Sequence, residues 1–424
     1  MSFRGADSRV DLTGWNFSID VKDDFRQMFV DAWRMERDNF YDPSLHGVDY
    51  KSTLAKYAAL LPRITTRAEL NDLIGWAVGE LSALHTAVRG GDLRAGEDQI
   101  QVASLGARLF RDRAKGGYRI DYIYRSDPDY PAERSPLADP DLGVKAGDVI
   151  TAVNGVATLS TKDIGELLRS QGGKQVLLTI ASAGQPSRDV VVDAATSEAN
   201  LRYADWEYTR RLETEKQGDG KIGYLHLRAM GTNDMNQFVR EFTPVFDKQG
   251  LVLDMRQNRG GNIDSWVLTT LMRKPWMYWK SRVGEPYWNM QGAPRGHMVM
   301  LVDAETASDG EAVADGFRRL GLGVVIGMRT WGGEIWLSDN TTLSDGGLAR
   351  APQSGVYGPE GKWLIEQEGV VPDIVVDNLP HETFNGRDAQ LEAAIAYLKK
   401  KIAEDPRAVP KPPPYPKKAV KMLP

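Results

Sequence analysis

The chain contains no cysteine, few histidines and no long hydrophobic run. The absence of cysteine among 424 residues excludes disulfides, thiolate nucleophiles and cysteine-based zinc sites. Its 5 histidines are scattered without an HExxH motif or another close pair, so a histidine metal site is not expected. No cofactor is predicted. No segment approaches the roughly 18 uninterrupted apolar residues of a membrane span, and the first residues lack the apolar core of a signal peptide. The sequence therefore predicts no membrane span.

A large excess of one charge is also missing. The formal net charge is −5, from 53 Lys and Arg against 58 Asp and Glu. This balance argues against nucleic acid or an anionic membrane as the main partner. Hydrophobic residues make up 42% and charged residues 26%, which is the composition of a globular protein. A chain of this length exceeds one ordinary core, so several domains are expected.

Residues 1–95 have the pattern of a small helical unit. A first helix is predicted by apolar residues at helical spacing, at Phe25, Met28, Phe29, Ala32, Trp33 and Phe40. A second helix opens with the capping-box pair Thr66 and Glu69 and continues along an apolar stripe to Leu81. His85 follows four residues after that stripe.

Residues 96–198 change to short strand-like runs, with one helix expected near 161–169. The stretch 147–155, Gly-Asp-Val-Ile-Thr-Ala-Val-Asn-Gly, resembles the signature of PDZ domains. The resemblance implies a domain that adds an extended peptide to a sheet edge, often holding its terminal carboxylate on backbone amides. Residues 104–107 are the candidate carboxylate loop, with Gly106 as a substrate-binding residue. The alternative is a PDZ-like spacer that binds nothing.

Residues 199–404 alternate apolar strands with helices, which predicts a parallel sheet covered by helices. The expected elements are strands at 250–256, 298–302 and 323–327, and helices at 263–273, 311–320 and 389–402. Sites in such sheets form beyond the carboxyl ends of the strands, where Gly260, Gly261 and Ser308 fall. Residues 405–424 form a Pro/Lys-rich tail that is expected to lack regular structure.

Ser308 lies between a predicted strand and a predicted helix. A serine at such a turn exposes its hydroxyl beside unpaired helix N–H groups, which can stabilise an oxyanion. Ser308 is therefore the leading candidate nucleophile. The alternative is a plain helix cap, because Ser308 and Glu311 have the spacing of a capping box.

Four motifs occur together in the order found in the tricorn core proteases, which are related to the C-terminal processing peptidases. These motifs are Leu-Asp-Met-Arg-Gln-Asn-Arg-Gly-Gly at 253–261, Ala-Ser-Asp-Gly at 307–310, Gly-Met-Arg-Thr-Trp-Gly-Gly at 327–333 and Ile-Glu-Gln-Glu-Gly-Val-Val-Pro-Asp at 365–373. The resemblance implies an α/β multidomain fold with a helical unit, a PDZ-like domain and a ClpP/crotonase-type α/β domain.

The resemblance also implies roles for individual residues. Ser308 matches the nucleophile and His85 the general base, while Glu366 matches the acidic residue that orients the histidine. Gly261 and Asp309 match the residues whose backbone N–H groups form the oxyanion hole. Read singly, His85 could instead be a packed or C-capping histidine, Glu366 a surface carboxylate, and Gly260-Gly261 a loop that opens a helix. Asp254 and Arg256 fit a structural ion pair better than a catalytic one.

One position departs from the family pattern, in which a serine commonly precedes the histidine and bridges it to the glutamate. This chain has Leu84 there. Glu366 would then contact His85 directly or through water, or the hydroxyl of Ser82 or Thr86 would replace that of the missing serine. The remaining alternative is that His85 is a weakened base.

Substrate preference is predicted from a second departure. An ungapped count from Gly261 places Trp279 where the archaeal family type has an acidic residue near the specificity pocket. Trp279 belongs to an aromatic cluster that either lines an apolar substrate pocket or packs in a core or interface: Trp276, Tyr278, Trp279, Tyr287 and Trp288. Gly260 is a further substrate-binding candidate. Only a weak preference for basic residues is expected.

The predicted function is hydrolysis of extended or unfolded peptides by a serine peptidase through an acyl-enzyme. One alternative is a catalytically weakened, PDZ-containing scaffold that binds peptides. Another is a crotonase-type thioester enzyme that uses carboxylates such as Glu311 or Glu366. The family resemblance further implies a homo-oligomer, upstream β-propeller domains absent from this chain, and a cytoplasmic location. An exported location would follow if a longer precursor carried a signal peptide.

Overall fold

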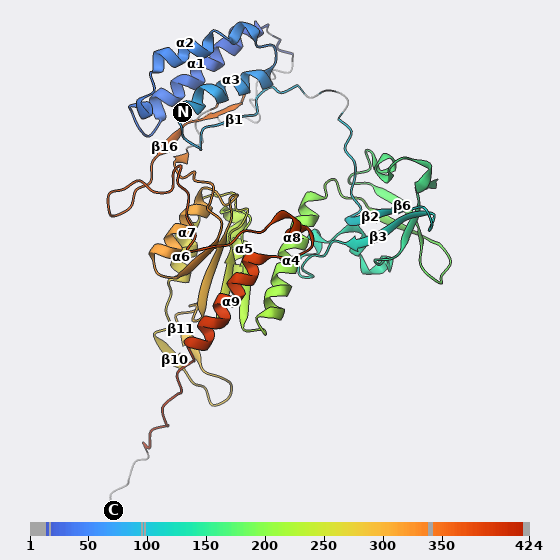
Figure 1. The fold of residues 1–424 in the computed structure, drawn as a ribbon, viewed down its shortest axis with the longest axis vertical. Helices are drawn as coiled ribbons and strands as arrows, with labels where there is room; N and C mark the ends of the chain where they lie inside the picture. Colours follow the sequence, from blue (N-terminus) through green and yellow to red (C-terminus); the bar gives the residue numbers. More distant parts are fainter. Residues whose placement is uncertain (1–13, 17, 95, 97–98, 338–341, 419–424) are drawn as a thin grey trace, which may run out of the picture. The chain divides into compact units, whose positions relative to one another are not determined.

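The computed structural model describes residues 14–418 except for 17, 95, 97, 98 and 338–341. The chain forms two compact units (Figure 1). One unit comprises Met1–Arg94 with Gly332–Gly369, and the other comprises Ala95–Trp331 with Val370–Pro424. Within the described residues, no helix is both long and apolar enough to cross a membrane.

The first unit is built on helices α1 (Val21–Asn39), α2 (Tyr50–Ala58) and α3 (Arg67–Gly79). Asp20 caps α1 through its side chain, and the predicted Thr66–Glu69 capping box is present at the start of α3. The expected apolar stripes bury Phe29, Trp33 and their neighbours in one core. Two short antiparallel pairs complete the unit: β1 (Ala87–Arg89) with β15 (Leu348–Arg350), and β14 (Trp336–Leu337) with β16 (Pro352–Ser354).

Residues 332–369 pack in this helical unit, whereas their place in the sequence assigns them to the α/β domain. Ile335, Leu343 and Ala349 are buried in the same core as the helices. The Arg67 guanidinium forms an ion pair with Asp345 at 2.6 Å, and the two side chains are only 4% and 12% exposed. These long-range contacts have no local sequence signal. As a result, His85 and Glu366 belong to one unit.

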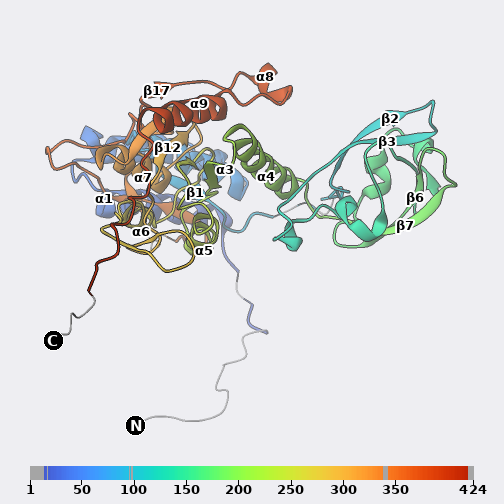
Figure 2. The ribbon, with the colours of Figure 1, turned by 90° about the horizontal axis from the view of Figure 1, so that it is seen from below.

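The second unit contains a β-rich lobe (Figures 1 and 2). Its strands follow the order β2-β3-β4-β6-β7 with antiparallel pairing, and β5 pairs with β4. Their bounds are β2 Ala107–Asp112, β3 Gly117–Ile123, β4 Val149–Val153, β5 Val156–Ala157, β6 Gln175–Ala181 and β7 Arg188–Asp193. The helix expected near 161–169 is a short 3-10 helix, η7 (Ile164–Leu168), which Asp163 caps.

A parallel five-stranded sheet forms the rest of this unit, in the order β17-β13-β12-β9-β8. The strands are β8 Ile222–His226, β9 Gly250–Asp254, β12 His297–Val302, β13 Gly323–Gly327 and β17 Ile374–Val375. The helices are α4 Ala199–Gln217, α5 Thr232–Phe242, α6 Asp264–Leu271, α7 Asp309–Arg319, α8 Pro380–Phe384 and α9 Ala389–Glu404. The apolar stripe of α9 packs on one face of the sheet, and Figure 1 shows α6 and α7 beside its other face. The predicted βαβ architecture is confirmed.

The buried Arg256 bonds the Asp254 carboxylate at 2.6 Å and Asp388 at 2.8 Å, as expected of a structural ion pair. The described part of the tail, residues 405–418, contains no helix or strand; residues 419–424 lie outside the described residues.

Candidate active site

Ser308 occupies a strained turn between β12 and α7. Its backbone has φ 55° and ψ −127°, a conformation that non-glycine residues rarely adopt. Such strain persists only where surrounding contacts enforce it, and it clusters at functional sites. The same geometry places a serine at the sharp strand-to-helix turn of other hydrolases. Ser308 is half-buried at the start of α7.

The turn is fixed by Glu311, a fully buried carboxylate on the first turn of α7. One carboxylate oxygen of Glu311 accepts the Ser308 N–H at 3.0 Å, and the other accepts the Thr330 hydroxyl. The capping contact anticipated from the sequence therefore coexists with the strained nucleophile geometry. Glu311 serves to hold the Ser308 backbone in place.

Two successive glycines after β9 have no room for a side chain. A Cβ added to Gly260, which has φ +75°, would lie 2.5 Å from the Ser308 Cβ. A Cβ added to Gly261 would lie 2.1 Å from the Met230 carbonyl oxygen. Gly260 thus lets the loop after β9 lie against the serine turn, and Gly261 lets it lie against the Met230 backbone.

Two backbone N–H groups next to this turn are candidates for an oxyanion hole. The bridge between Met230 and Gly261 uses the Gly260 carbonyl and the Asn262 N–H, so the Gly261 N–H takes no part in it. Across the described residues, neither the Gly261 N–H nor the Asp309 N–H donates to a protein acceptor. Asp309 is buried and Gly261 is exposed. Two open N–H groups beside a strained serine suit a developing negative charge.

Asn258 organises both loops, and sequence reasoning did not single it out. Its side-chain oxygen accepts the Gly260 N–H at 2.9 Å, and its amide donates to the Leu227 carbonyl at 2.8 Å. Its own carbonyl accepts the Ala307 N–H at 2.9 Å. The only local signal was an asparagine between a buried strand and two glycines.

The Asp309 side chain binds the start of α6, whereas its N–H is a candidate for the oxyanion hole. Its carboxylate accepts N–H bonds from Ile263 at 2.6 Å and Asp264 at 3.1 Å, which caps the start of α6. Burial raises the pKa of Asp309 to about 7, and the charge of Asp264 adds to that shift. The two hydrogen bonds act in the opposite direction. The side chain joins α6 to α7.

In the first unit, His85 lies on the half-buried loop between α3 and β1. Burial lowers the pKa of His85 below its ordinary value. The Glu366 carboxylate opposes this shift, and the positive charge of Arg350 reinforces it. His85 thus stays neutral, and able to accept a proton, at a lower pH than a free histidine.

Glu366 is held by backbone donors. One carboxylate oxygen accepts the Leu84 N–H at 2.9 Å, and the other accepts N–H groups of Glu334 at 2.8 Å and Ile335 at 3.2 Å. The family's serine is absent at position 84, but the backbone of that residue still contacts the glutamate. The Thr86 hydroxyl, a suggested substitute, donates to the Ala83 carbonyl at 3.0 Å.

The backbone on both sides of Glu366 is strained. Ile365 has φ 67° and Gln367 has φ 63°, and a positive φ is especially unfavourable for a β-branched residue. The Gln367 amide donates to the Ser82 carbonyl, which ties this turn to the loop that carries His85. Strain at both neighbours of one carboxylate marks that carboxylate as more than a surface group.

Tyr41 and His46 form a further contact that sequence reasoning missed. The His46 Nδ1 lies 2.8 Å from the Leu81 carbonyl, and the Tyr41 hydroxyl lies 2.6 Å from Nε2. A carbonyl only accepts, so Nδ1 carries the proton and Nε2 accepts from Tyr41. The Tyr41 ring also meets Trp363 edge to face at 5.5 Å. This pair joins the loop before His85 to the segment before Glu366.

The structure gives less support to two other candidates. Trp279 lies on β10 (Met277–Trp279), paired with β11 (Tyr287–Asn289), after the end of α6 and before the start of β12. This hairpin therefore lies near the amino ends of the strands, whereas Ser308 follows the carboxyl end of β12. The Gly106 N–H donates to the Ser104 hydroxyl oxygen at 3.0 Å. Roles for Trp279 and Gly106 in substrate binding stay predictions.

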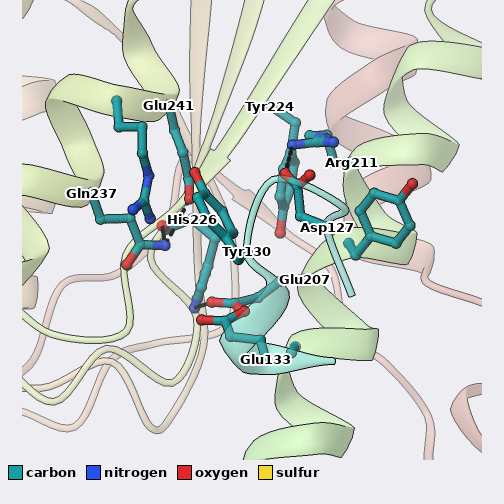
Figure 3. Close-up of a pocket in the computed structure, with 12 residues that line it drawn as sticks. Asp127, Tyr130, Glu133, Glu207, Arg211, Tyr224, His226, Gln237 and Glu241 are labelled. Carbon is teal, nitrogen blue, oxygen red and sulfur yellow. Dashed lines mark hydrogen bonds and ion pairs between the residues drawn. The ribbon is translucent and has the colours of Figure 1, made fainter. Parts of the chain in front are cut away.

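A separate pocket in the second unit is lined by the segment 127–133 and by side chains of α4, β8 and α5 (Figure 3). Asp127 pairs with Arg211, and the Gln237 amide donates to Glu241 at 2.9 Å. Burial raises the pKa of Glu241 to about 7. None of the predicted catalytic residues lines this pocket. The described residues also contain no cluster of side chains suited to a metal ion.

Three protein families match successive parts of the chain. Peptidase family S41 matches residues 221–376, the tricorn protease C1 domain matches 21–79, and the tricorn protease PDZ domain matches 103–197. Tricorn protease homolog 1 of Streptomyces coelicolor is 35% identical over 95% of this chain and 37% of its own length. A tricorn-like protease C-terminal subunit of Sulfurisphaera tokodaii is 34% identical over 93% of this chain and 45% of its own.

A crystal structure of the tricorn protease superposes with a TM-score of 0.85 at 26% identity, covering 91% of this chain and 37% of that one. The α/β domain falls in the class that peptidase family S41 represents. The chain belongs to the tricorn protease family. It spans less than half the length of these relatives.

Proposed function

We propose that this chain hydrolyses peptide bonds in extended or unfolded peptides through an acyl-enzyme on Ser308. The observation that carries the proposal is the strained Ser308 turn, held by Glu311 and flanked by two N–H groups with no acceptor among the described residues. A capping serine alone needs neither the strain nor the open donors.

In this mechanism, His85 is the general base for Ser308. His85 takes the hydroxyl proton as the Ser308 oxygen attacks the substrate carbonyl, because a serine hydroxyl is a weak nucleophile without a base. The Gly261 and Asp309 N–H groups bind the oxyanion. His85 then gives its proton to the leaving amine, and water hydrolyses the acyl-enzyme by the reverse proton transfers. Glu366 stabilises the imidazolium electrostatically and holds the Leu84 backbone beside it.

Replacement of the nucleophile tests the proposal. Ser308→Ala is expected to lower kcat/KM for an extended fluorogenic peptide by about 10⁴-fold or more. The matched control is Ser265→Ala, an exposed serine on α6 in the same unit, which should keep full activity. A fluorophosphonate probe should label the parent chain and not the Ser308 variant. Normal hydrolysis by Ser308→Ala would refute the assignment.

The two alternative functions predict different results. A peptide-binding scaffold would bind substrate but neither hydrolyse it nor react with the probe. A crotonase-type enzyme would depend on Glu311 for chemistry, yet both oxygens of Glu311 are engaged in holding Ser308 and Thr330. That engagement favours the peptidase.

Assembly and location belong to the same proposal. The natural enzyme is proposed to be a homo-oligomer that acts in the cytoplasm and works with β-propeller domains located outside this chain. Analytical ultracentrifugation of the purified chain tests the oligomer.

A further inference from the structure

A second histidine of the helical unit holds the loop in front of the proposed base. The His46 Nδ1 lies 2.8 Å from the carbonyl oxygen of Leu81, a fully buried residue four positions before His85. Leu81 follows the end of α3, where the chain leaves the helix and its carbonyls have no partner within the helix. His46 thus supplies from outside the donor that this carbonyl needs.

The next part of the same loop is held by the segment around Glu366. The Ser82 carbonyl accepts the Gln367 side-chain amide, and the Leu84 N–H donates to the Glu366 carboxylate at 2.9 Å. Ser82 has φ 51°, so the loop makes a strained turn between these contacts. Together with the contact to His46, these bonds hold the loop at three points just before the proposed base.

The backbone of His46 is itself held in an uncommon conformation. Leu45 and His46 have φ 54° and 53°, and a left-handed backbone is rare for residues other than glycine. The Asp42 carboxylate accepts the His46 N–H at 2.9 Å and the Ser44 hydroxyl at 2.8 Å. Such strain persists only where neighbouring contacts enforce it. The turn therefore directs the imidazole toward the Leu81 carbonyl.

Tyr41 selects the tautomer of His46 that suits this contact. Its hydroxyl lies 2.6 Å from Nε2, and the two rings meet edge to face at 5.3 Å. Burial raises the pKa of the Tyr41 hydroxyl, and the charges of Asp42 and Glu366 add to that shift. Tyr41 therefore stays a donor at neutral pH, and its bond to Nε2 leaves the ring proton on Nδ1, which faces the Leu81 carbonyl.

We infer that His46 is a positioning residue for the proposed reaction: through the Leu81 carbonyl it fixes the loop that carries His85, and Tyr41 supports it by fixing the tautomer. The inference rests on the proposed function, in which His85 is the base. A loop that shifts by about 1 Å would slow proton transfer without weakening substrate binding, because such misplacement of a reacting group costs up to about 100-fold in rate. A contact that only stabilised the fold would change the Tm and leave kcat of the folded enzyme unchanged.

Two substitutions at one position separate these roles. His46→Leu removes the ring donor, and the neighbouring Leu45 shows that leucine can adopt the same φ. His46→Asn keeps an N–H donor at the δ position and suits a positive φ. With a fluorogenic peptide, we expect His46→Leu to lower kcat by about 10- to 100-fold with KM within about twofold, and His46→Asn to recover most of that loss. His381→Leu, at an exposed histidine of α8 in the other unit, is the control and should keep full activity.

Hydrogen exchange of residues 81–86, measured by mass spectrometry on the full chain, gives a readout that needs no activity. We expect faster exchange in His46→Leu and exchange like that of the parent in His46→Asn. Tyr41→Phe removes the hydroxyl and keeps the ring, so it should lower kcat and speed exchange in the same way, but to a smaller extent. Thermal unfolding of each variant confirms that it is folded at the assay temperature.

Several results would overturn the inference. They are a kcat in His46→Leu equal to that of the parent, an His46→Asn variant as slow as His46→Leu, or unchanged exchange of residues 81–86 in His46→Leu. If His46→Leu does not fold, kcat and exchange in Tyr41→Phe equal to those of the parent would overturn it instead. A parent chain that fails to hydrolyse peptides would refute the proposed function, whereas the exchange comparison would still test whether His46 holds the loop.

Discussion

The protonation of His85 gives the sharpest test of the candidate active site. Burial and Arg350 lower the pKa of His85, whereas Glu366 raises it. If His85 is the base, kcat/KM should fall on the acid side through a pKa below 6.5. Removing the Arg350 charge should move this acid limb to higher pH, and removing the Glu366 charge should move it to lower pH.

The direction of each shift follows from the surroundings of the imidazole. An opposite charge nearby favours the protonated imidazole, and a like charge disfavours it. His85 is half-buried, so solvent screens these charges only in part. Arg350→Gln should therefore lose kcat/KM at pH values below the limb and keep its plateau. Glu366→Gln should also lose plateau activity, because an amide cannot accept all three backbone N–H groups that the carboxylate accepts.

The assay is the initial rate on a fluorogenic peptide between pH 4.5 and 9, with folding checked by circular dichroism at each pH. Arg89→Gln is the matched control, since Arg89 is an exposed arginine on the strand after His85 and should leave the limb in place. Acid limbs that move in the same direction in the two variants, or do not move, would refute His85 as the base.

Three further outcomes are expected. Gly261→Ala forces a Cβ against the Met230 carbonyl and should lower kcat by about 10²–10³-fold in the peptide assay, whereas Gly75→Ala, in open space on α3, should keep activity. Asp345→Asn should lower the free energy of unfolding by about 3 kcal/mol in urea at pH 7, since it leaves Arg67 buried and unpaired. The pKa of Asp345 is lowered to about 2, so the wild-type chain should lose its extra stability over the variant as pH falls from 4 toward 2. Glu241→Gln should raise the Tm more at pH 8 than at pH 5, because a carboxyl whose pKa is raised to about 7 contributes stability below pH 4.5 and loses it as pH rises through 7. Equal shifts at both pH values would contradict the last reasoning.

The regular elements could be predicted because their signals are local. Strand β13 has the predicted bounds, and α7 begins two residues before its predicted start. The 3-10 helix η7 is shorter than the predicted helix, because a five-residue turn with Gly165 has too little apolar periodicity to define its length. The nucleophile and glycine loop were identifiable because Ser308 and Gly260-Gly261 lie within short motifs at strand ends.

The remaining features depend on contacts between distant segments. Nothing near Asp345 in the sequence shows that it pairs with Arg67, and that pairing helps place Glu366 in the helical unit. The bond from the Leu84 N–H to Glu366 has no sequence signal, because every residue except proline has the same backbone N–H. Tyr41 and His46 were missed because neither has a motif.

The backbone of Ser308 has a consequence for how this chain can change over generations. At φ 55° and ψ −127° glycine is the residue with the least strain, and relief of such strain is worth about 1 kcal/mol or more. Drift at this position would therefore favour glycine on stability grounds, and threonine, which is branched at Cβ, would be strongly disfavoured. Only selection for the hydroxyl itself can keep serine here, so an inactive descendant of this chain should gain stability at the position where it lost its chemistry.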